Sequence, residues 1–119
     1  MAYADGYVLA VPRKHLAFYK KMATLGARTW MKHGALEYKE CVGEDLAANG
    51  QIPFGKMMKI KRSETVVFSW VVFKSRKHRD KVNAAVYEEM GAMKWDPKDM
   101  AIMKKLRIVY GGFEVLVSR

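Results

Sequence analysis

Two glutamates are the main candidates for acid–base chemistry in this sequence. Glu40 and Glu114 each lie in an alternating segment, on the side that also carries apolar residues. Two carboxyl groups on interior-facing positions of strands could act together as a general acid and a general base. The alternative is that one or both lie at a sheet edge or pair with a basic side chain, because charged residues are rarely buried alone. The second explanation is the more common one, so the pair is a catalytic hypothesis only.

Aromatic residues form a second candidate site. They lie in segments that alternate like strands, so their rings share sheet faces with apolar residues. Aromatic residues at this spacing can bind a ligand, but they more often belong to a core. The predicted ligand-binding residues are Tyr7, Tyr38, Trp70 and Tyr110, with Phe68 beside them.

A basic segment at residues 75–79 is the third candidate. Ser75 is a good N-cap residue for a helix, and cations in the turn that follows it oppose the helix dipole. Free backbone amides and these side chains could together hold a phosphate or a carboxylate. The alternative is a solvated turn whose charge is compensated by Asp80 and Glu64. The predicted anion-binding residues are Ser75, Arg76, Lys77 and Arg79.

The sequence predicts no metal site and no cofactor. His15, His33 and His78 are far apart, and Cys41 has no second cysteine nearby. There is also no phosphate-binding glycine loop and no nucleophile elbow. A lone cysteine excludes an internal disulfide framework and indicates a reducing, cytoplasmic location. We therefore predict that Cys41 is a free thiol.

Composition indicates one globular domain covering residues 1–119. Half of the 119 residues are hydrophobic and 29% are charged. No apolar run approaches the roughly 20 residues of a membrane helix, and the N-terminus does not resemble a signal peptide. The net charge of +10 is compatible with nucleic acid, an anionic surface or acidic ligands as partners, or with ordinary surface charge.

The elements that must position these residues are organised around one strand at residues 64–73. Both sides of this strand are apolar, so both should be covered. One side carries Val66, Phe68, Trp70 and Val72, and the other carries Val67, Ser69, Val71 and Phe73. Further strands are predicted at 7–11, 35–42 and 107–117, and a short basic one at 57–61. Helices are predicted at 13–33 and from Ser75 to about Gly91, with a loop and a short helix at 92–106. This order predicts an α+β, ferredoxin-like βαββαβ antiparallel sheet with an extra short strand.

Helices cover only one face of such a sheet. The other face of the central strand would then expose a large apolar patch, which is rare on a soluble monomer. A twofold dimer with its sheets packed face to face would cover the patch, and a ligand cleft open to water is the alternative.

Several segments together resemble one protein family. They are Tyr3–Pro12, Gly34–Leu36 with Glu40 and Cys41, Glu64–Trp70, Ser75 with Arg79 and Asp80, and Tyr110–Glu114. Nearly the whole chain is similar to the uncharacterised YbaA-like family of small bacterial proteins. The resemblance implies a ferredoxin-like protomer that pairs into a dimeric α/β barrel, and it implies no activity. Members are often acidic, whereas this chain is basic, and Lys104 stands where they tend to carry a carboxylate.

We therefore predict a homodimeric α/β-barrel protein that binds or converts a small molecule, anionic or aromatic, in an internal cleft. The alternative is a basic module that binds nucleic acid through exposed aromatic residues of an open sheet. The two hypotheses exclude each other, because the dimer would bury the face that a nucleic acid needs.

Overall fold

Two long strands form the centre of a four-stranded antiparallel sheet. The computed structural model of the chain describes residues 1–47 and 49–119. In these residues the strands are β1 (Tyr3–Pro12), β2 (Glu37–Val42), β3 (Glu64–Phe73) and β4 (Arg107–Glu114), in the spatial order β2-β3-β1-β4. β1 and β3 pair along their whole length, from Tyr3 opposite Phe73 to Pro12 opposite Glu64. This is the predicted ferredoxin-like sheet.

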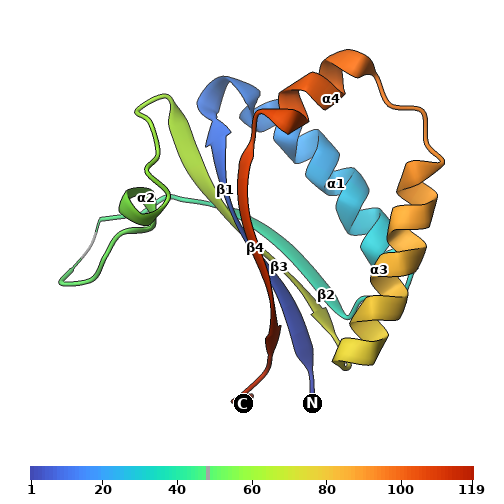
Figure 1. The fold of residues 1–119 in the computed structure, drawn as a ribbon. Coiled ribbons are helices and arrows are strands. Elements are labelled where there is room, and N and C mark those ends of the chain that lie inside the picture. Colours follow the sequence, from blue (N-terminus) through green and yellow to red (C-terminus); the bar gives the residue numbers. More distant parts are fainter. Residues whose placement is uncertain (48) are drawn as a thin grey trace.

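Helices lie mainly on one face of this sheet (Figure 1). The 3₁₀ turn η1 (Arg13–His15) leads into α1 (Leu16–Lys32), and α3 (Arg76–Gly91) and α4 (Pro97–Lys104) lie on the same side. The one-turn helix α2 (Phe54–Met57) projects on the other side of the sheet. None of the helices in the described residues is long and apolar enough to cross a membrane.

Helix ends follow the local signals in the sequence. Gly34, with φ of 110°, ends α1 directly after His33. The hydroxyl oxygen of Ser75 accepts a hydrogen bond from the backbone N–H of His78 at 3.1 Å and caps α3. Asp96 caps α4 in the same way, and Pro97 is its first residue. These caps fix where the chain enters and leaves the helix layer.

One strand predicted within the described residues is absent, and several predicted boundaries were wrong, among them the end of β4, which lies at Glu114 and not at residue 117. Residues 57–61 form no strand, because Met57 ends α2 and Lys59 turns the chain with a φ of 50°. Alternation over so few residues fits such a turn as well as it fits a strand. β1 begins at Tyr3 instead of Tyr7, because Asp5 and Gly6 lie inside the strand and do not form a turn.

The core lies between the sheet and the helices in two separate clusters. The side of β3 that faces the helices is the one that carries Val67, Ser69, Val71 and Phe73. One cluster consists of Leu9, Val11, Tyr19, Val67 and Leu106. The other consists of Ala35, Val71, Phe73, Val82 and Val86. Because the two clusters do not merge, space is left between them on the helix side of the sheet.

The opposite face of the sheet is largely open. The strand register places Val8, Phe68, Trp70, Val109 and Phe113 on it. Phe68 is 41% exposed, Val109 57% and Phe113 60%. Only the end near α2 is covered, where the rings of Phe54 and Phe68 meet at 5.8 Å. The sheet therefore presents an apolar surface that no other described element of the chain covers.

Candidate ligand-binding site

A row of polar side chains crosses the helix side of the sheet. Glu40 of β2 lies opposite Ser69 of β3, Ser69 lies opposite Tyr7 of β1, and Tyr7 lies opposite Tyr110 of β4. Directly paired residues in antiparallel strands point to the same side, so all four belong to one face. The row separates the two core clusters and forms the floor of the space between them.

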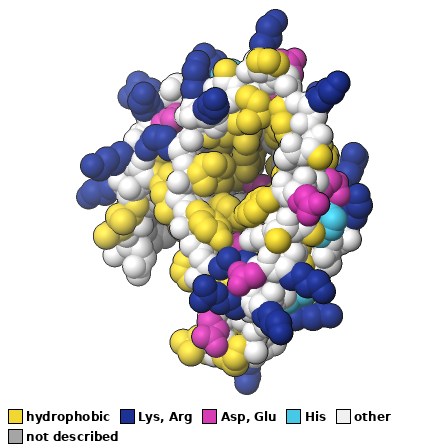
Figure 2. Space-filling view, turned by 45° about the vertical axis from the view of Figure 1, so that its right-hand side comes forward, with side chains coloured by type: hydrophobic (Ala, Val, Ile, Leu, Met, Phe, Trp, Pro, Cys, Tyr) yellow, Lys and Arg dark blue, Asp and Glu magenta, His cyan; other side chains and the backbone are white. Residues whose placement is uncertain are grey.

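This space is a cavity of about 460 Å³ that is open to solvent on one side and is lined by residues of the sheet and of α1, α3 and α4. Figure 2 shows a hollow whose wall consists of hydrophobic side chains, with basic side chains around its outside. Its volume is typical of cavities that bind small molecules. The residues used in the argument below are Tyr7, Tyr19, Trp30, Tyr38, Glu40 and Trp95.

Glu40 is held by two tyrosines from different elements. The hydroxyl of Tyr19, on α1, donates to Oε1 of Glu40 at 2.7 Å. The hydroxyl of Tyr38, two residues before Glu40 on β2, donates to Oε2 at 2.6 Å. Tyr38 can reach this position because Gly26 of α1 has no side chain, and a Cβ there would lie 3.1 Å from the Tyr38 oxygen. The carboxylate therefore has a fixed position in the cavity.

The tyrosines in the cavity stay protonated at neutral pH. Burial, and then the charge and hydrogen bond of Glu40, raise the pKa of Tyr19 and Tyr38 far above the ordinary value for tyrosine. Burial also raises the pKa of Tyr7, and no side chain among the described residues accepts a hydrogen bond from it. The cavity thus offers one carboxylate acceptor together with hydroxyl groups, one of which is free to donate.

The walls of the cavity are aromatic and methionine-rich. The indole N–H of Trp30 donates to Asn83 at 2.9 Å, and that of Trp95 donates to the carbonyl oxygen of Met90 at 2.9 Å. Both indoles are thereby held in place and offer apolar faces. The methionines that line the wall are Met22, Met90, Met100 and Met103. Methionine side chains adapt readily to the shape of a ligand.

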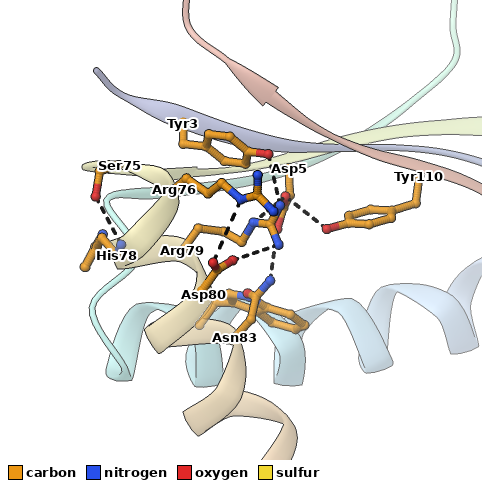
Figure 3. A network of polar contacts seen from close by, with 10 residues as sticks. Tyr3, Asp5, Ser75, Arg76, His78, Arg79, Asp80, Asn83 and Tyr110 are labelled. Carbon is orange, nitrogen blue, oxygen red and sulfur yellow. Dashed lines mark hydrogen bonds and ion pairs between the residues drawn. The ribbon is translucent and has the colours of Figure 1, made fainter.

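A buried ionic network next to the cavity fixes α3 to the sheet (Figure 3). Asp5 of β1 is fully buried, and its Oδ1 lies 3.3 Å from Nε of Arg79. Asn83 donates to its other carboxylate oxygen at 3.1 Å, and the Tyr110 hydroxyl donates to Oδ1 at 3.1 Å. Burial, and then the charge of Asp5, raise the pKa of Tyr110 to about 12. The network positions α3, whose C-terminal end forms part of the cavity wall.

The two predicted catalytic glutamates do not lie together. Glu40 lies in the cavity, half-buried. Glu114 is exposed at the end of edge strand β4, four residues beyond Tyr110, which is in line with Glu40 across the sheet. Four residues of strand correspond to about 13 Å. Alternation placed each glutamate on the apolar side of its own strand, and the strand register puts both on the helix side of the sheet, but alternation could not give their separation.

The predicted aromatic residues divide between the two faces of the sheet. Tyr7 and Tyr38 line the cavity. Trp70 lies on the open face, where its indole N–H donates to Glu37 at 3.0 Å, and Tyr110 belongs to the Asp5 network. Sequence reasoning missed Tyr19, Trp30 and Trp95 as site residues. The first two were visible only as members of the apolar stripe of a helix, and Trp95 lies in an irregular segment without periodicity.

The basic segment before and within the first turn of α3 is partly neutralised by carboxylates. Arg79 turns inward to Asp5, and its Nη1 also lies 3.1 Å from Asp80. Arg76 lies 3.9 Å from Asp80 and is exposed, as is Lys77. Asp80 therefore compensates charge as the alternative explanation expected, whereas Glu64 pairs with Arg107 elsewhere. Anion binding at Ser75, Arg76, Lys77 and Arg79 stays a prediction.

Comparisons with known proteins agree with the fold. A family model described as "Protein of unknown function (DUF1428)" matches residues 2–104. The uncharacterised proteins YbaA of Escherichia coli (strain K12) and of Shigella flexneri are each 34% identical over 118 residues, covering 99% of both sequences. A crystal structure of a dimeric ferredoxin-like protein from an uncultured marine organism aligns over 100% of both chains, with a TM-score of 0.61 and 12% identity. A second such protein covers 100% of this chain and 98% of its own, with a TM-score of 0.57 and 9% identity.

Proposed function

Because the chain belongs to the family described as protein of unknown function (DUF1428), we propose a function from the geometry of its own cavity. The protein binds a small, largely apolar molecule that carries a hydrogen-bond donor. The Glu40 carboxylate is the acceptor, and the apolar wall encloses the rest of the molecule. The observation that carries this proposal is a carboxylate, held by Tyr19 and Tyr38, on the floor of an otherwise apolar cavity.

The hydrogen bonds of Glu40 leave capacity for a ligand. An ionised carboxylate accepts about four hydrogen bonds, and the two tyrosines use one on each oxygen. Glu40 is half-buried among apolar side chains, and a polar group in such surroundings binds a matching donor more strongly than it would in open water. The free hydroxyl of Tyr7 supplies a second point of contact. These groups would fix the orientation of a molecule that the apolar wall alone would hold loosely.

The same geometry is suitable for proton transfer. A general base must lie within hydrogen-bond reach of the proton that it removes, and a donor bound to Glu40 would meet this condition. Tyr19 and Tyr38 would keep the carboxylate in place during the transfer. Whether the bound molecule is released unchanged or converted then depends on how acidic its donor is.

Binding can be tested with N-phenyl-1-naphthylamine, a neutral apolar probe that fluoresces more strongly in apolar surroundings and carries one N–H donor. We expect saturable binding with one probe per chain. Ala23 of α1 lines the cavity, so Ala23→Phe should fill it and weaken binding by about tenfold or more. Ala17→Phe, at an exposed position of the same helix, is the matched control and should bind like the wild type.

The role of the acceptor can be tested with two competitors of similar shape. 1-Naphthol carries an O–H donor, and 1-methoxynaphthalene does not. We expect the wild type to prefer 1-naphthol and Glu40→Gln to lose most of that preference, since a hydrogen bond to a charged acceptor is stronger than one to a neutral acceptor. An equal affinity for both competitors in the wild type would refute the role of Glu40, and an absence of probe binding would refute the cavity itself.

We propose further that two copies of the chain pair through the open sheet face. The support is the exposed apolar surface formed by Phe68, Val109 and Phe113, together with the dimeric state stated for the two ferredoxin-like proteins of similar fold. A symmetric pair would cover the same patch on both copies. We also propose a cytoplasmic location. The single cysteine, Cys41, is an exposed free thiol on an edge strand, and such thiols persist in a reducing compartment.

Nucleic acid binding is the competing use of the open face, favoured by its exposed aromatic rings. Its charge argues against this use. The register places two cationic residues on this face, Lys39 and Arg107, and each lies near a carboxylate: Lys39 at 3.6 Å from Glu37 and Arg107 at 2.9 Å from Glu64. A salt titration with single-stranded RNA separates the two uses, because phosphate contacts by free cations would give a steep loss of affinity with salt.

A further inference from the structure

The lining of the cavity has a charge opposite to that of the chain as a whole. The chain carries 22 Lys and Arg against 12 Asp and Glu. Among the described residues that line the cavity there is no Lys, Arg or His, and Glu40 is the only charged side chain. The basic side chains visible in Figure 2 lie outside the hollow. The positive net charge is therefore a property of the outer surface and not of the site.

Glu40 also differs from the two buried acidic residues, Asp5 and Glu64. Asp5 lies 3.3 Å from Arg79, and Glu64 lies 2.9 Å from Arg107, so each of these carboxylates has a cation as its partner. Glu40 has only tyrosine hydroxyls, and it forms no ion pair within residues 1–47 and 49–119. Glu40 is half-buried in an apolar cavity, and charges in apolar surroundings are normally paired, so the cavity contains a carboxylate whose cationic partner is missing from the described chain.

Aromatic rings surround this carboxylate. Trp30 and Tyr38 lie with their ring centres 5.8 Å apart at an angle of 40°, so they form adjoining walls. Tyr7, Tyr19 and Trp95 line the same cavity. The faces of such rings attract cations and replace part of the water that an ammonium group loses on entering a cavity. A carboxylate and aromatic faces together form a surrounding that suits a positive charge and opposes a negative one.

We infer that the cavity accepts an organic cation, namely a protonated amine on an apolar body, with its ammonium group at Glu40 and its apolar part against the aromatic and methionine wall. This inference rests on the proposed function and narrows the class of ligand. It excludes the anionic small molecules that the net charge of the chain suggested. The ammonium group donates to Glu40 in place of water and neutralises the one charge in the cavity.

Three naphthyl compounds of nearly equal shape test this inference by direct calorimetric titration. 1-Naphthylmethylamine is a cation at neutral pH, 1-naphthylmethanol is neutral, and 1-naphthoate is an anion. At physiological salt we expect the amine to bind the wild type about tenfold more tightly than the alcohol, since a charge-assisted hydrogen bond is roughly twice as strong as a neutral one. We expect the naphthoate to bind most weakly of the three.

Two variants identify the source of the preference. Glu40→Gln should bind the amine no better than the alcohol. Glu37→Gln removes the same charge from the same strand but on the opposite face, so it should keep the wild-type preference. An equal loss in both variants would assign the effect to general surface charge and overturn the inference.

The wild type alone also decides the question, should Glu40→Gln fail to fold. Binding of the alcohol as tightly as the amine, or more tightly, would overturn the organic cation and leave the proposed function standing. A failure of all three compounds to bind would refute the proposed function together with the inference. Tight binding of 1-naphthoate would overturn the inference in the other direction, by showing that the site selects anions.

Discussion

Phe113→Lys should separate the two copies of the proposed dimer. Phe113 projects from β4 onto the open face and is 60% exposed in the single chain. Its ring lies over Gly6 and Gly111, where an added Cβ would in each case lie 3.3 Å from a ring carbon. Because these two positions have no side chains, the ring lies flat on the sheet and presents its other side outward.

The expected loss can be worked out from this exposure. A phenylalanine side chain has about 200 Å² of accessible surface, and an exposed fraction of 60% leaves about 120 Å² to be buried in the dimer. At about 25 cal/mol per Å² this corresponds to about 3 kcal/mol per copy, or about 6 kcal/mol for both copies of a symmetric interface. The apolar stem of lysine recovers part of this energy. We expect a loss of about 3–6 kcal/mol, so the dimer should dissociate 10²- to 10⁴-fold more readily.

Sedimentation equilibrium over a range of concentrations measures this change directly. The wild type should be dimeric at micromolar concentration and Phe113→Lys largely monomeric, with unchanged circular dichroism. Tyr87→Lys is the matched control, because Tyr87 is 55% exposed on α3, on the helix side of the sheet. A monomeric wild type, or a Phe113→Lys variant as dimeric as the wild type, would refute the assignment of the open face as the interface.

Three further predictions concern charged groups. Asp5→Ala should lower the free energy of unfolding in urea by about 2–4 kcal/mol, because it leaves a mostly buried arginine without its carboxylate; a loss below about 0.5 kcal/mol would contradict this. The backbone amide of Lys61, and then the guanidinium of Arg107, hold the pKa of Glu64 below its ordinary value, so Glu64→Gln should cost about 1 kcal/mol at neutral pH. This difference should disappear as the pH falls through the folded-state pKa. A difference that persists in acid would assign the effect to packing. Phosphate should raise the melting temperature of the wild type more than that of an Arg76→Ala, Lys77→Ala variant, and equal gains would leave residues 75–79 a solvated turn.

Local signals were sufficient for most of the secondary structure. His33 and Gly34 ended α1, Ser75 began α3 and Asp96 began α4, because a cap depends on residues within one helical turn. The start of β1 depended on distant residues instead. Asp5 can lie inside the strand because Arg79 and Asn83, far along the chain, satisfy its carboxylate. Contacts with residues so distant in sequence cannot be recognised from the residue types around Asp5.

The candidate site was only half visible in the sequence. Alternation predicted that Tyr38 and Glu40 share a face, and both line the cavity. Glu114 shares that face by the same parity but lies at the far end of the sheet, since parity gives the direction of a side chain and not its position along the strand. Tyr19 contacts Glu40 because α1 packs against the sheet, and Trp95 lines the cavity because the segment after α3 folds back over it. Neither contact can be read from the local sequence.

The central strand, β3, shows most clearly what the sequence determined and what the tertiary structure determined. The sequence by itself divided β3 into two apolar sides and required that both be covered, because successive side chains in a strand point to opposite faces. It could not decide which side the helices cover, since Val67, Val71 and Phe73 are as apolar as Val66, Phe68 and Trp70. The tertiary structure decided this through the strand register, which brings Glu40, Ser69 and Tyr7 into one row under the helices and leaves Phe68 and Trp70 on the open face. Pairing between strands that are distant in sequence is a property of the whole chain, and the cavity exists only because of it.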